Sequence, residues 1–230
     1  MVLRLESDDF WVAVLAFAVI AVLAVREALK ARERTEAWRR FARSLGCEFS
    51  FRDPFDTVDT LKHHLFHHGH SRRVTNVMYG EYEGTPIRCF DYRYTIGFGR
   101  SSHTLKYTCV LLKSPIPFEK LVIRPEEAGD KIGRLVGVND VQFESEDFNR
   151  QFCVQCQDKR FAFAVLHQRV MEYLMKEDDL ALEGAGDALV FYDIYGQSWV
   201  NSLRRDTKRL LKFGLGFIEL LPRYLQTGSN

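Results

Sequence analysis

An uninterrupted apolar stretch near the N-terminus constrains this chain more than any other feature. Residues 10–25 read FWVAVLAFAVIAVLAV, which is 16 positions of apolar and aromatic side chains only. At 1.5 Å rise per residue they form about 24 Å of helix, slightly less than the about 30 Å of a bilayer core. The apolar stems of Arg26 and Lys30 can extend the span, and Trp11 occupies a position typical of an interfacial aromatic. We therefore predict a transmembrane helix over residues 10–25.

Two other interpretations of this stretch have to be compared with the first. A cleaved signal peptide begins with a basic segment, whereas residues 1–9 contain Glu6, Asp8 and Asp9 against a single Arg4. A core helix of a soluble domain is the second alternative, but its first turns would be hydrophobic on every side. Both alternatives are weaker than the membrane span.

The charges that flank the stretch predict its orientation. One Lys or Arg precedes it, whereas residues 26–45 contain seven against three acids. The seven are Arg26, Lys30, Arg32, Arg34, Arg39, Arg40 and Arg43. Lys and Arg remain on the cytoplasmic side of a span. We expect residues 1–9 to be extracytoplasmic and the chain from Arg26 onward to be cytoplasmic, where cysteines stay reduced.

The segment directly after the span is expected to continue as a basic juxtamembrane helix over residues 26–46. It lacks Pro, and Gly46 is a natural C-terminal stop. Trp38, Phe41, Ala42 and Leu45 follow helical spacing and form an apolar stripe. The basic residues either contact anionic headgroups or form a solvated face, and the sequence favours neither.

The rest of the chain predicts an α+β domain, with a mainly antiparallel sheet and packed helices, over residues 74–225. An apolar fraction of 46% and a charged fraction of 27% fit a folded core rather than a disordered tail. The preceding residues 47–73 contain Pro54, Gly69 and five His, and we interpret them as an irregular segment with a helical turn or two near residues 58–66. Expected strands cover residues 74–82, 85–94, 103–113, 121–124, 141–144 and 152–156, with a hairpin formed by 180–183 and 188–195. Expected helices cover residues 126–136, 146–150, 158–176 and 198–222.

The histidine run is the most conspicuous local motif. His63 and His67, and likewise His64 and His68, are four residues apart, which on a helix is a spacing that chelates a transition metal. His70 follows, but no Cys or carboxylate completes a tetrahedral set. We therefore assign no metal ligand and favour a polar loop; a response to pH is a weaker alternative.

No other motif supports catalysis, so we assign no catalytic, cofactor-binding or metal residue and expect no cofactor. Cys153 and Cys156 form a C-x-x-C, but on a strand rather than at a helix N-terminus. Residues 97–99 (Gly-Phe-Gly) lie between two strands, so we expect a hairpin tip instead of a phosphate loop. His167 flanks an apolar helix face, where a structural role is favoured.

The last helix is basic and amphipathic. Arg204, Arg205, Lys208 and Lys212 share one face, and apolar residues including Leu203, Leu210, Gly214, Phe217 and Leu221 share another. Such a helix either lies on an anionic membrane or packs its apolar side on its own domain, and the second is commoner. A net charge of +1 argues against a nucleic-acid partner.

Several motifs resemble an uncharacterised family of bacterial, mainly actinobacterial, single-pass membrane proteins. They are Asn76-Val77 with Gly80, residues 90–94 (FDYRY), 124–126 (RPE) and 143–152 (FESEDFNRQF), followed by Asp158, Phe161, Ala162, Leu166, His167, Met171 and Glu172. The resemblance covers roughly residues 30–221. It implies a membrane-tethered cytoplasmic domain at the bacterial inner membrane and supplies no activity, and the His run departs from it.

Two functional hypotheses follow. The first is a non-catalytic accessory subunit that interacts with the lipid bilayer and with membrane protein partners. The second is a ligand-binding or enzymatic domain whose site is assembled from scattered residues such as Asp91, Tyr92, Tyr94 and Glu144.

Overall fold

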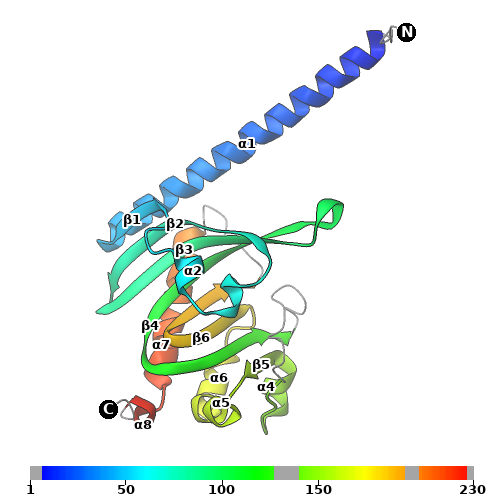
Figure 1. The fold of residues 1–230 in the computed structure, drawn as a ribbon. Coiled ribbons are helices and arrows are strands. Elements are labelled where there is room, and N and C mark those ends of the chain that lie inside the picture. The colour runs from blue at the N-terminus through cyan, green and yellow to red at the C-terminus, as the bar shows by residue number, and fades with distance from the viewer. Residues whose placement is uncertain (1–6, 127–139, 195–201, 227–230) are drawn as a thin grey trace.

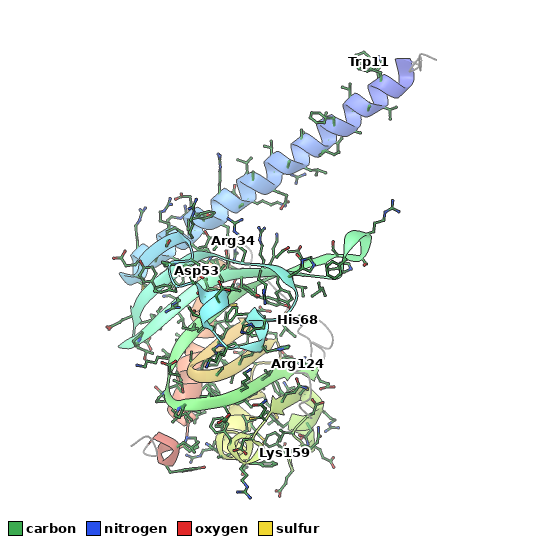
Figure 2. All side chains as sticks on the ribbon, viewed as in Figure 1. Trp11, Arg34, Asp53, His68, Arg124 and Lys159 are labelled. Atoms are coloured by element: carbon green, nitrogen blue, oxygen red, sulfur yellow. The ribbon has the colours of Figure 1, made fainter. Side chains whose placement is uncertain are left out.

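A single helix 39 residues long dominates the outline of the molecule. The computed structural model describes residues 7–126, 140–194 and 202–226. Helix α1 (Ser7–Leu45) contains neither Gly nor Pro and ends where Gly46 adopts a φ of 68°, as predicted. Its N-terminal half projects far from the domain, with Trp11 near the distal end (Figures 1 and 2). Within the described residues it is the one helix long and apolar enough to cross a membrane, and its apolar part is unburied.

The C-terminal half of α1 packs on the domain through the predicted apolar stripe. Trp38, Phe41 and Ala42 are buried, and Leu45 packs against them. The stripe lies against β1 (Glu48–Arg52) and β2 (His70–Tyr82). One continuous helix therefore passes from full exposure into the hydrophobic core.

The domain is built on one antiparallel sheet of six strands, which confirms the α+β fold class. After β1 and β2 come β3 (Thr85–Ile96), β4 (His103–Pro125), β5 (Phe152–Cys156) and β6 (Leu180–Asp193). The strand order is β1-β2-β3-β4-β5, and β6 pairs with β4. The predicted meander of three strands is present as β2, β3 and the first half of β4, whereas β1 was not anticipated.

Strand β4 is the longest and organises the sheet. Its first half pairs with β3, its end pairs with β5, and β6 pairs along both halves. The register shifts near Phe118, close to two prolines that cannot donate to a ladder. The separate strand predicted at residues 121–124 is wrong, because these residues continue β4 through this irregularity.

The hairpin predicted across residues 184–187 is also wrong. Residues 182–192 run as one strand, β6, antiparallel to β4 throughout. Gly184 makes room for the Phe118 ring, which would lie 2.3 Å from a Cβ at that position. Gly186 has a φ of 61° and permits the register shift. The two glycines thus allow a bulge, not a reversal.

Short helices complete the fold. They are α2 (Thr57–Thr60), the 3₁₀ turns η1 (His64–Phe66) and η2 (Gly99–Ser101), α4 (Glu146–Gln151), α5 (Lys159–Val165), α6 (Gln168–Leu174) and α8 (Arg223–Gln226), together with the longer α7 (Leu203–Leu220). The helix predicted over 158–176 is in fact α5 and α6, separated at Leu166 and His167. Residues 141–144 form no strand; Asp140 makes a single bridge to Gln155. The predicted helix at 126–136 and the start of the last helix at 198 lie outside the described residues.

The sheet separates two cores. One face is covered by α1, α7, α4, α5 and α6, with Leu112, Phe191 and Phe217 among its buried residues. The other face is covered by the turn η1 and is rich in tyrosine, with Tyr92, Tyr94, Tyr107 and Tyr192 buried. Alternation along β3 places neighbouring residues in different cores.

Candidate functional site

A buried ion pair joins α1 to the centre of the sheet. Arg34 donates from Nε to Asp91 Oδ2 over 2.8 Å and from Nη2 to Asp91 Oδ1 over 2.6 Å. Nη2 also donates to Thr108 Oγ1 on β4 over 2.9 Å. All three residues are buried. A guanidinium that meets both carboxylate oxygens in this way fixes distance and orientation together. Arg34 lies where α1 meets the domain (Figure 2), so the pair sets the direction in which the exposed half of α1 leaves the sheet.

Asn76 supports this pair from β2. Its Nδ2 donates to Asp91 Oδ2 over 2.9 Å, and its Oδ1 accepts from Thr35 Oγ1 of α1 over 2.9 Å. Asn76 has a φ of 55°, and the pairing of β2 with β3 gains one residue between Thr75 and Met78. Asn tolerates this left-handed conformation better than most residues. The bulge directs Asn76 at α1, and we name Arg34, Thr35, Asn76, Asp91 and Thr108 the helix clamp.

A second polar group lies on the tyrosine-rich face. Glu183 of β6 is buried and accepts from Tyr192 Oη and from the Leu65 backbone N–H, both over 2.9 Å. Burial raises the pKa of the Glu183 carboxyl to about 7, although the hydrogen bonds from Leu65 and Tyr192 oppose the shift. The carboxyl therefore titrates near neutral pH.

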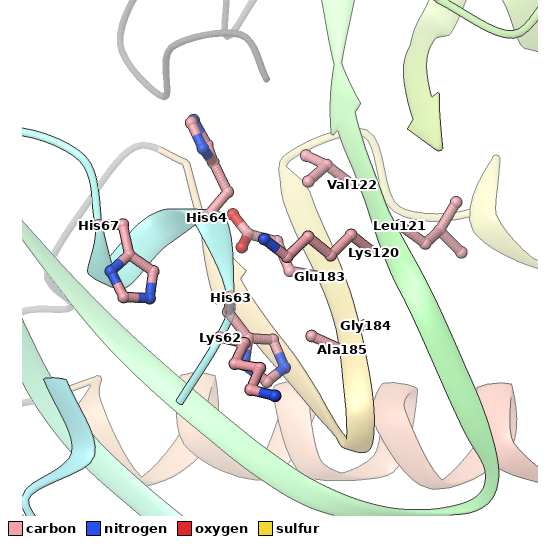
Figure 3. Close-up of a pocket in the computed structure, with 10 residues that line it drawn as sticks. All are labelled: Lys62, His63, His64, His67, Lys120, Leu121, Val122, Glu183, Gly184 and Ala185. Atoms are coloured by element: carbon pink, nitrogen blue, oxygen red, sulfur yellow. The ribbon is translucent and has the colours of Figure 1, made fainter. Parts of the chain in front are cut away.

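His63 lies beside Glu183 and is equally buried. Its Nε2 is 3.0 Å from the Ala188 carbonyl oxygen, so it carries the proton and donates, while Nδ1 has no partner among the described residues. Burial lowers the pKa of the imidazole to about 4, so the ring is neutral. Figure 3 shows both residues beside a cavity of about 120 Å³ that lies between η1 and strands β4 and β6. A site for a small organic ligand typically spans about 300–1,000 Å³, so this cavity fits only a few water-sized groups.

The histidines of the run do not lie on a regular helix. His63 precedes the 3₁₀ turn, so the predicted helical geometry does not form, although the rings of His64 and His68 lie with their centroids 5.6 Å apart. His67 Nε2 bonds the Leu61 carbonyl, His68 packs edge-on against Tyr94, and His70 belongs to β2. Among the described residues no group of three His, Cys, Asp or Glu has the geometry of a metal site.

The remaining motifs have structural roles. Cys153 and Cys156 lie on β5, and burial raises the pKa of both thiols. His167 caps α6, and its Nε2 bonds the Leu220 carbonyl at the end of α7. Residues 97–99 belong to the loop between β3 and β4, as predicted.

The C-terminal basic helix packs on its own domain. Leu203, Leu210, Gly214 and Phe217 of α7 are buried against the sheet. The cationic residues Arg204, Arg205 and Lys212 are exposed on the other side. The commoner of the two predicted arrangements is therefore the one observed.

The four residues of the scattered-site hypothesis do not converge. Asp91 faces α1 in the helix clamp, whereas Tyr92 and Tyr94 face the opposite core, and Glu144 is exposed. Sequence reasoning missed Arg34 and Glu183. The signal for Arg34 was Asp91 itself, the one acid of β3, which stands between Phe90 and Tyr92, because a buried carboxylate requires a partner.

Comparisons with known proteins place this geometry in a structural context. No protein-family model and no curated protein matches the chain. Among solved structures, the chain is similar to the crystal structure of the mycobacterial trehalose monomycolate transport factor A, TtfA. The TM-score is 0.62 at 14% sequence identity, and the match covers 83% of this chain and 97% of TtfA. The chain therefore shares its fold with an actinobacterial protein.

Proposed function

We propose that this protein is a membrane-anchored, non-catalytic accessory subunit of a larger transport assembly. Its helix α1 spans the bacterial cytoplasmic membrane once over residues 10–25, with the N-terminus outside and the α+β domain on the cytoplasmic face. Its partners are the lipid bilayer and integral membrane proteins, and it binds no nucleic acid.

The observation that carries this proposal is the continuity of α1. The apolar half exposes large side chains such as Phe17 and Ile20 on all sides, and no part of it is buried by the domain. An exposed apolar surface of this extent is stable only against lipid or a protein partner. The same helix enters the core only further along, at Trp38, and is fixed there by Arg34. Its apolar half over residues 10–25 is therefore not the core helix of a soluble domain.

The arrangement of polar groups supports a role without catalysis. Arg34 donates hydrogen bonds to Asp91 and neutralises its charge. Glu183 accepts hydrogen bonds from Tyr192 and from the Leu65 backbone of the same domain. The likeness to TtfA, a transport factor, supports an accessory role in transport rather than an enzymatic one. A ligand-binding function is the alternative, and the small volume of the cavity beside Glu183 disfavours it at that position.

Substitution within α1 tests the anchor. A variant with Phe17→Arg and Ile20→Arg places two charges near the middle of the span, where each Arg costs about 2.5–3.5 kcal/mol on insertion scales. We expect it to leave the membrane fraction under alkaline extraction, whereas the wild type stays. Phe163→Arg is the matched control, because Phe163 is also an exposed phenylalanine but lies on α5. A wild-type protein released by alkali contradicts the anchor.

Partner capture tests the accessory role. Tagged full-length protein is cross-linked in intact cells, solubilised in mild detergent and purified, with the Phe17→Arg, Ile20→Arg variant in parallel. We expect integral membrane proteins to co-purify with the wild type alone. Recovery of the monomer by itself contradicts a role in an assembly. A C-terminal fluorescent-protein fusion, which fluoresces only in the cytoplasm, tests the orientation.

A further inference from the structure

The hairpin that joins β3 and β4 extends beyond the sheet alongside α1. Its base is fixed at the helix clamp, where Arg34 contacts the register pair Asp91 and Thr108. The ladder then continues for five further positions to Ile96 paired with His103. Figure 1 shows this hairpin leaving the domain on the side toward which α1 projects.

An electrostatic contact supports the same direction. Lys106 lies two positions beyond Thr108 toward the tip, and Glu27 lies seven residues before Arg34 on α1. The charge of Lys106, after that of Lys30, helps to lower the pKa of the Glu27 carboxyl. The helix and the hairpin therefore stay near one another as both leave the clamp.

The two elements extend over similar lengths from the clamp. From Arg34 to the last apolar residue, Val25, α1 is about 13 Å long at 1.5 Å per residue. From Asp91 to Ile96 the ladder is about 17 Å long at 3.3 Å per residue, and the loop follows. If α1 spans the bilayer over residues 10–25, a hairpin of this length is long enough to reach the headgroups.

The loop presents an aromatic side chain to its surroundings. Phe98 is 80% exposed, more than Phe17 of the apolar helix at 74%. Gly97 and Gly99 on either side have φ values of 73° and 59°, and a Cβ on Gly97 would lie 2.6 Å from the Ser101 carbonyl oxygen. The backbone of the loop thus requires glycine around a single protruding phenylalanine.

The orientation of Phe98 is supported from β2. Its ring stacks on His70 with centroids 4.9 Å apart and an interplanar angle of 9°. His70 Nε2 also bonds the Gly97 carbonyl oxygen over 2.9 Å. Phe98 is therefore held outward by a defined contact instead of folding back onto the sheet.

The charge of the hairpin fits an anionic surface. Residues 93–106 contain Arg93, Arg100 and Lys106 and no acid, and the three cations are exposed. Interfacial membrane contacts combine an inserted aromatic with cations that bind anionic headgroups. A basic segment of α1 also follows the proposed span directly.

We propose that the β3–β4 hairpin is a second membrane contact, in which Phe98 inserts at the headgroup boundary of an anionic leaflet and Arg93, Arg100 and Lys106 bind lipid headgroups. This inference rests on the proposed membrane span of α1. It adds a lipid-binding surface that orients the domain on the bilayer.

Fluorescence in lipid nanodiscs tests the contact with the full-length protein. A Phe98→Trp variant is reconstituted in discs of mixed phosphatidylcholine and phosphatidylglycerol, with and without lipids that carry a quencher near the headgroup. We expect the added emission to be blue-shifted and quenched by at least about half, as for a side chain at the acyl boundary. Tyr224→Trp is the matched control, because Tyr224 is 64% exposed on α8, and its added emission should stay unquenched. Water-like, unquenched emission from position 98 overturns the proposal, including the case in which the hairpin binds only a protein partner.

Charge substitution tests the electrostatic part. The triple variant Arg93→Gln, Arg100→Gln, Lys106→Gln, made in the Phe98→Trp protein, should lose most of the quenching. The wild-type hairpin should also be quenched less in discs of neutral lipid alone. The control triple variant Lys159→Gln, Arg160→Gln, Arg169→Gln removes the same charge from the exposed surface of α5 and α6 and should change nothing. Equal losses in both triple variants overturn the assignment of these three cations.

The anchor is measured in the same samples. Trp11 lies at the outer end of the proposed span, so the lipid quencher near the headgroup should reduce native emission, and Trp11→Phe should abolish this change. Quenching at Trp11 without quenching at position 98 rejects the hairpin contact and leaves the proposed span in place. Absence of quenching at Trp11 rejects the proposed span and the inference that rests on it.

Discussion

Arg34 and Asp91 are 57 positions apart in the chain and meet through two hydrogen bonds in the interior of the domain. The Arg34 guanidinium neutralises the buried Asp91 carboxylate. The pair connects the only helix that leaves the described domain to the strand at the middle of the sheet.

Removal of one partner of this pair should destabilise the domain strongly. Arg34→Met leaves the Asp91 carboxylate buried without its cation, which costs about 3–5 kcal/mol of unfolding free energy. Denaturant unfolding of the full-length protein in detergent micelles, followed by the fluorescence of the buried Trp38, measures the loss. Arg39→Met is the matched control: Arg39 pairs with Glu36 on the exposed face of α1, and its loss should cost less than about 1 kcal/mol.

The double variant Arg34→Met, Asp91→Leu separates pairing from packing. With both charges removed, no buried group is left unneutralised, so the double variant should be more stable than Arg34→Met alone. A double variant that is as unstable as the sum of the two single variants contradicts the assigned role of the pair.

The pH dependence of stability should reveal Glu183. Its pKa is about 7 in the folded protein, against 4.5 for the unfolded reference. The folded state therefore binds more protons between pH 4.5 and 7, and this group's contribution is full below pH 4.5 and lost as the pH rises through about 7. The advantage of the wild type over Glu183→Gln should fall by about 3 kcal/mol across that range. A difference between the two proteins that does not change with pH would falsify this assignment.

His63 should show the opposite dependence. Its folded pKa is about 4, against 6.5 for the unfolded reference, so the unfolded state binds more protons between pH 4 and 6.5. Stability from this group is present above pH 6.5 and lost as the pH falls through about 4. The wild type compared with His63→Gln should gain about 3 kcal/mol between pH 4 and 6.5, measured by the same unfolding titration. In the wild type the slopes of Glu183 and His63 nearly cancel between pH 4.5 and 6.5.

Gly214 should resist substitution although it lies within a helix. Ala is favoured over Gly in a helix by about 1 kcal/mol. A Cβ at this position of α7, however, would lie 2.6 Å from Leu112 Cδ1 and 2.9 Å from the Phe191 ring. We expect Gly214→Ala to destabilise by about 1–3 kcal/mol because the core is overpacked. Lys212→Ala, on the exposed side of α7, is the control and should be nearly neutral in thermal unfolding.

Thiol reactivity should distinguish one cysteine from the other four. Cys89, Cys109, Cys153 and Cys156 are buried, and Cys47 is partly exposed. Burial raises the pKa of Cys153 and Cys156, and also that of Cys47, so access to the reagent distinguishes Cys47 from the others. Native full-length protein treated with a thiol reagent near pH 8 should lose at most one thiol, and Cys47→Ala should lose none until it is denatured. Rapid labelling of the C-x-x-C pair in the native protein would instead indicate redox chemistry there.

The elements that the sequence predicted correctly are those whose signal is local. The stripe of Trp38, Phe41 and Ala42 has helical spacing, and the alternation in β3 and β4 has a period of two, so both patterns follow from the backbone itself. Gly46 ends α1 because it adopts the left-handed conformation that favours glycine.

The elements that the sequence misplaced depend on contacts between distant residues. Gly184 and Gly186 resemble a turn, but Phe118 from β4 occupies the space that Gly184 leaves. The division between α5 and α6 is stabilised by the hydrogen bond from His167 to the Leu220 carbonyl, 53 positions away. Glu183 is recognisable as buried only once Tyr192 and Leu65 are placed around it. None of these partners is visible in a local pattern.

Helix α1 has neither a glycine nor a proline along its 39 residues, so no helix-breaking residue lies between its apolar end and the sheet. One residue inserted between Val25 and Arg34 would turn the sheet by about 100° around the helix axis and shift it by about 1.5 Å. The rotational orientation of the domain around the helix axis is therefore set by the number of residues in that stretch of helix. A rotation of the apolar end about this axis is transmitted to the sheet.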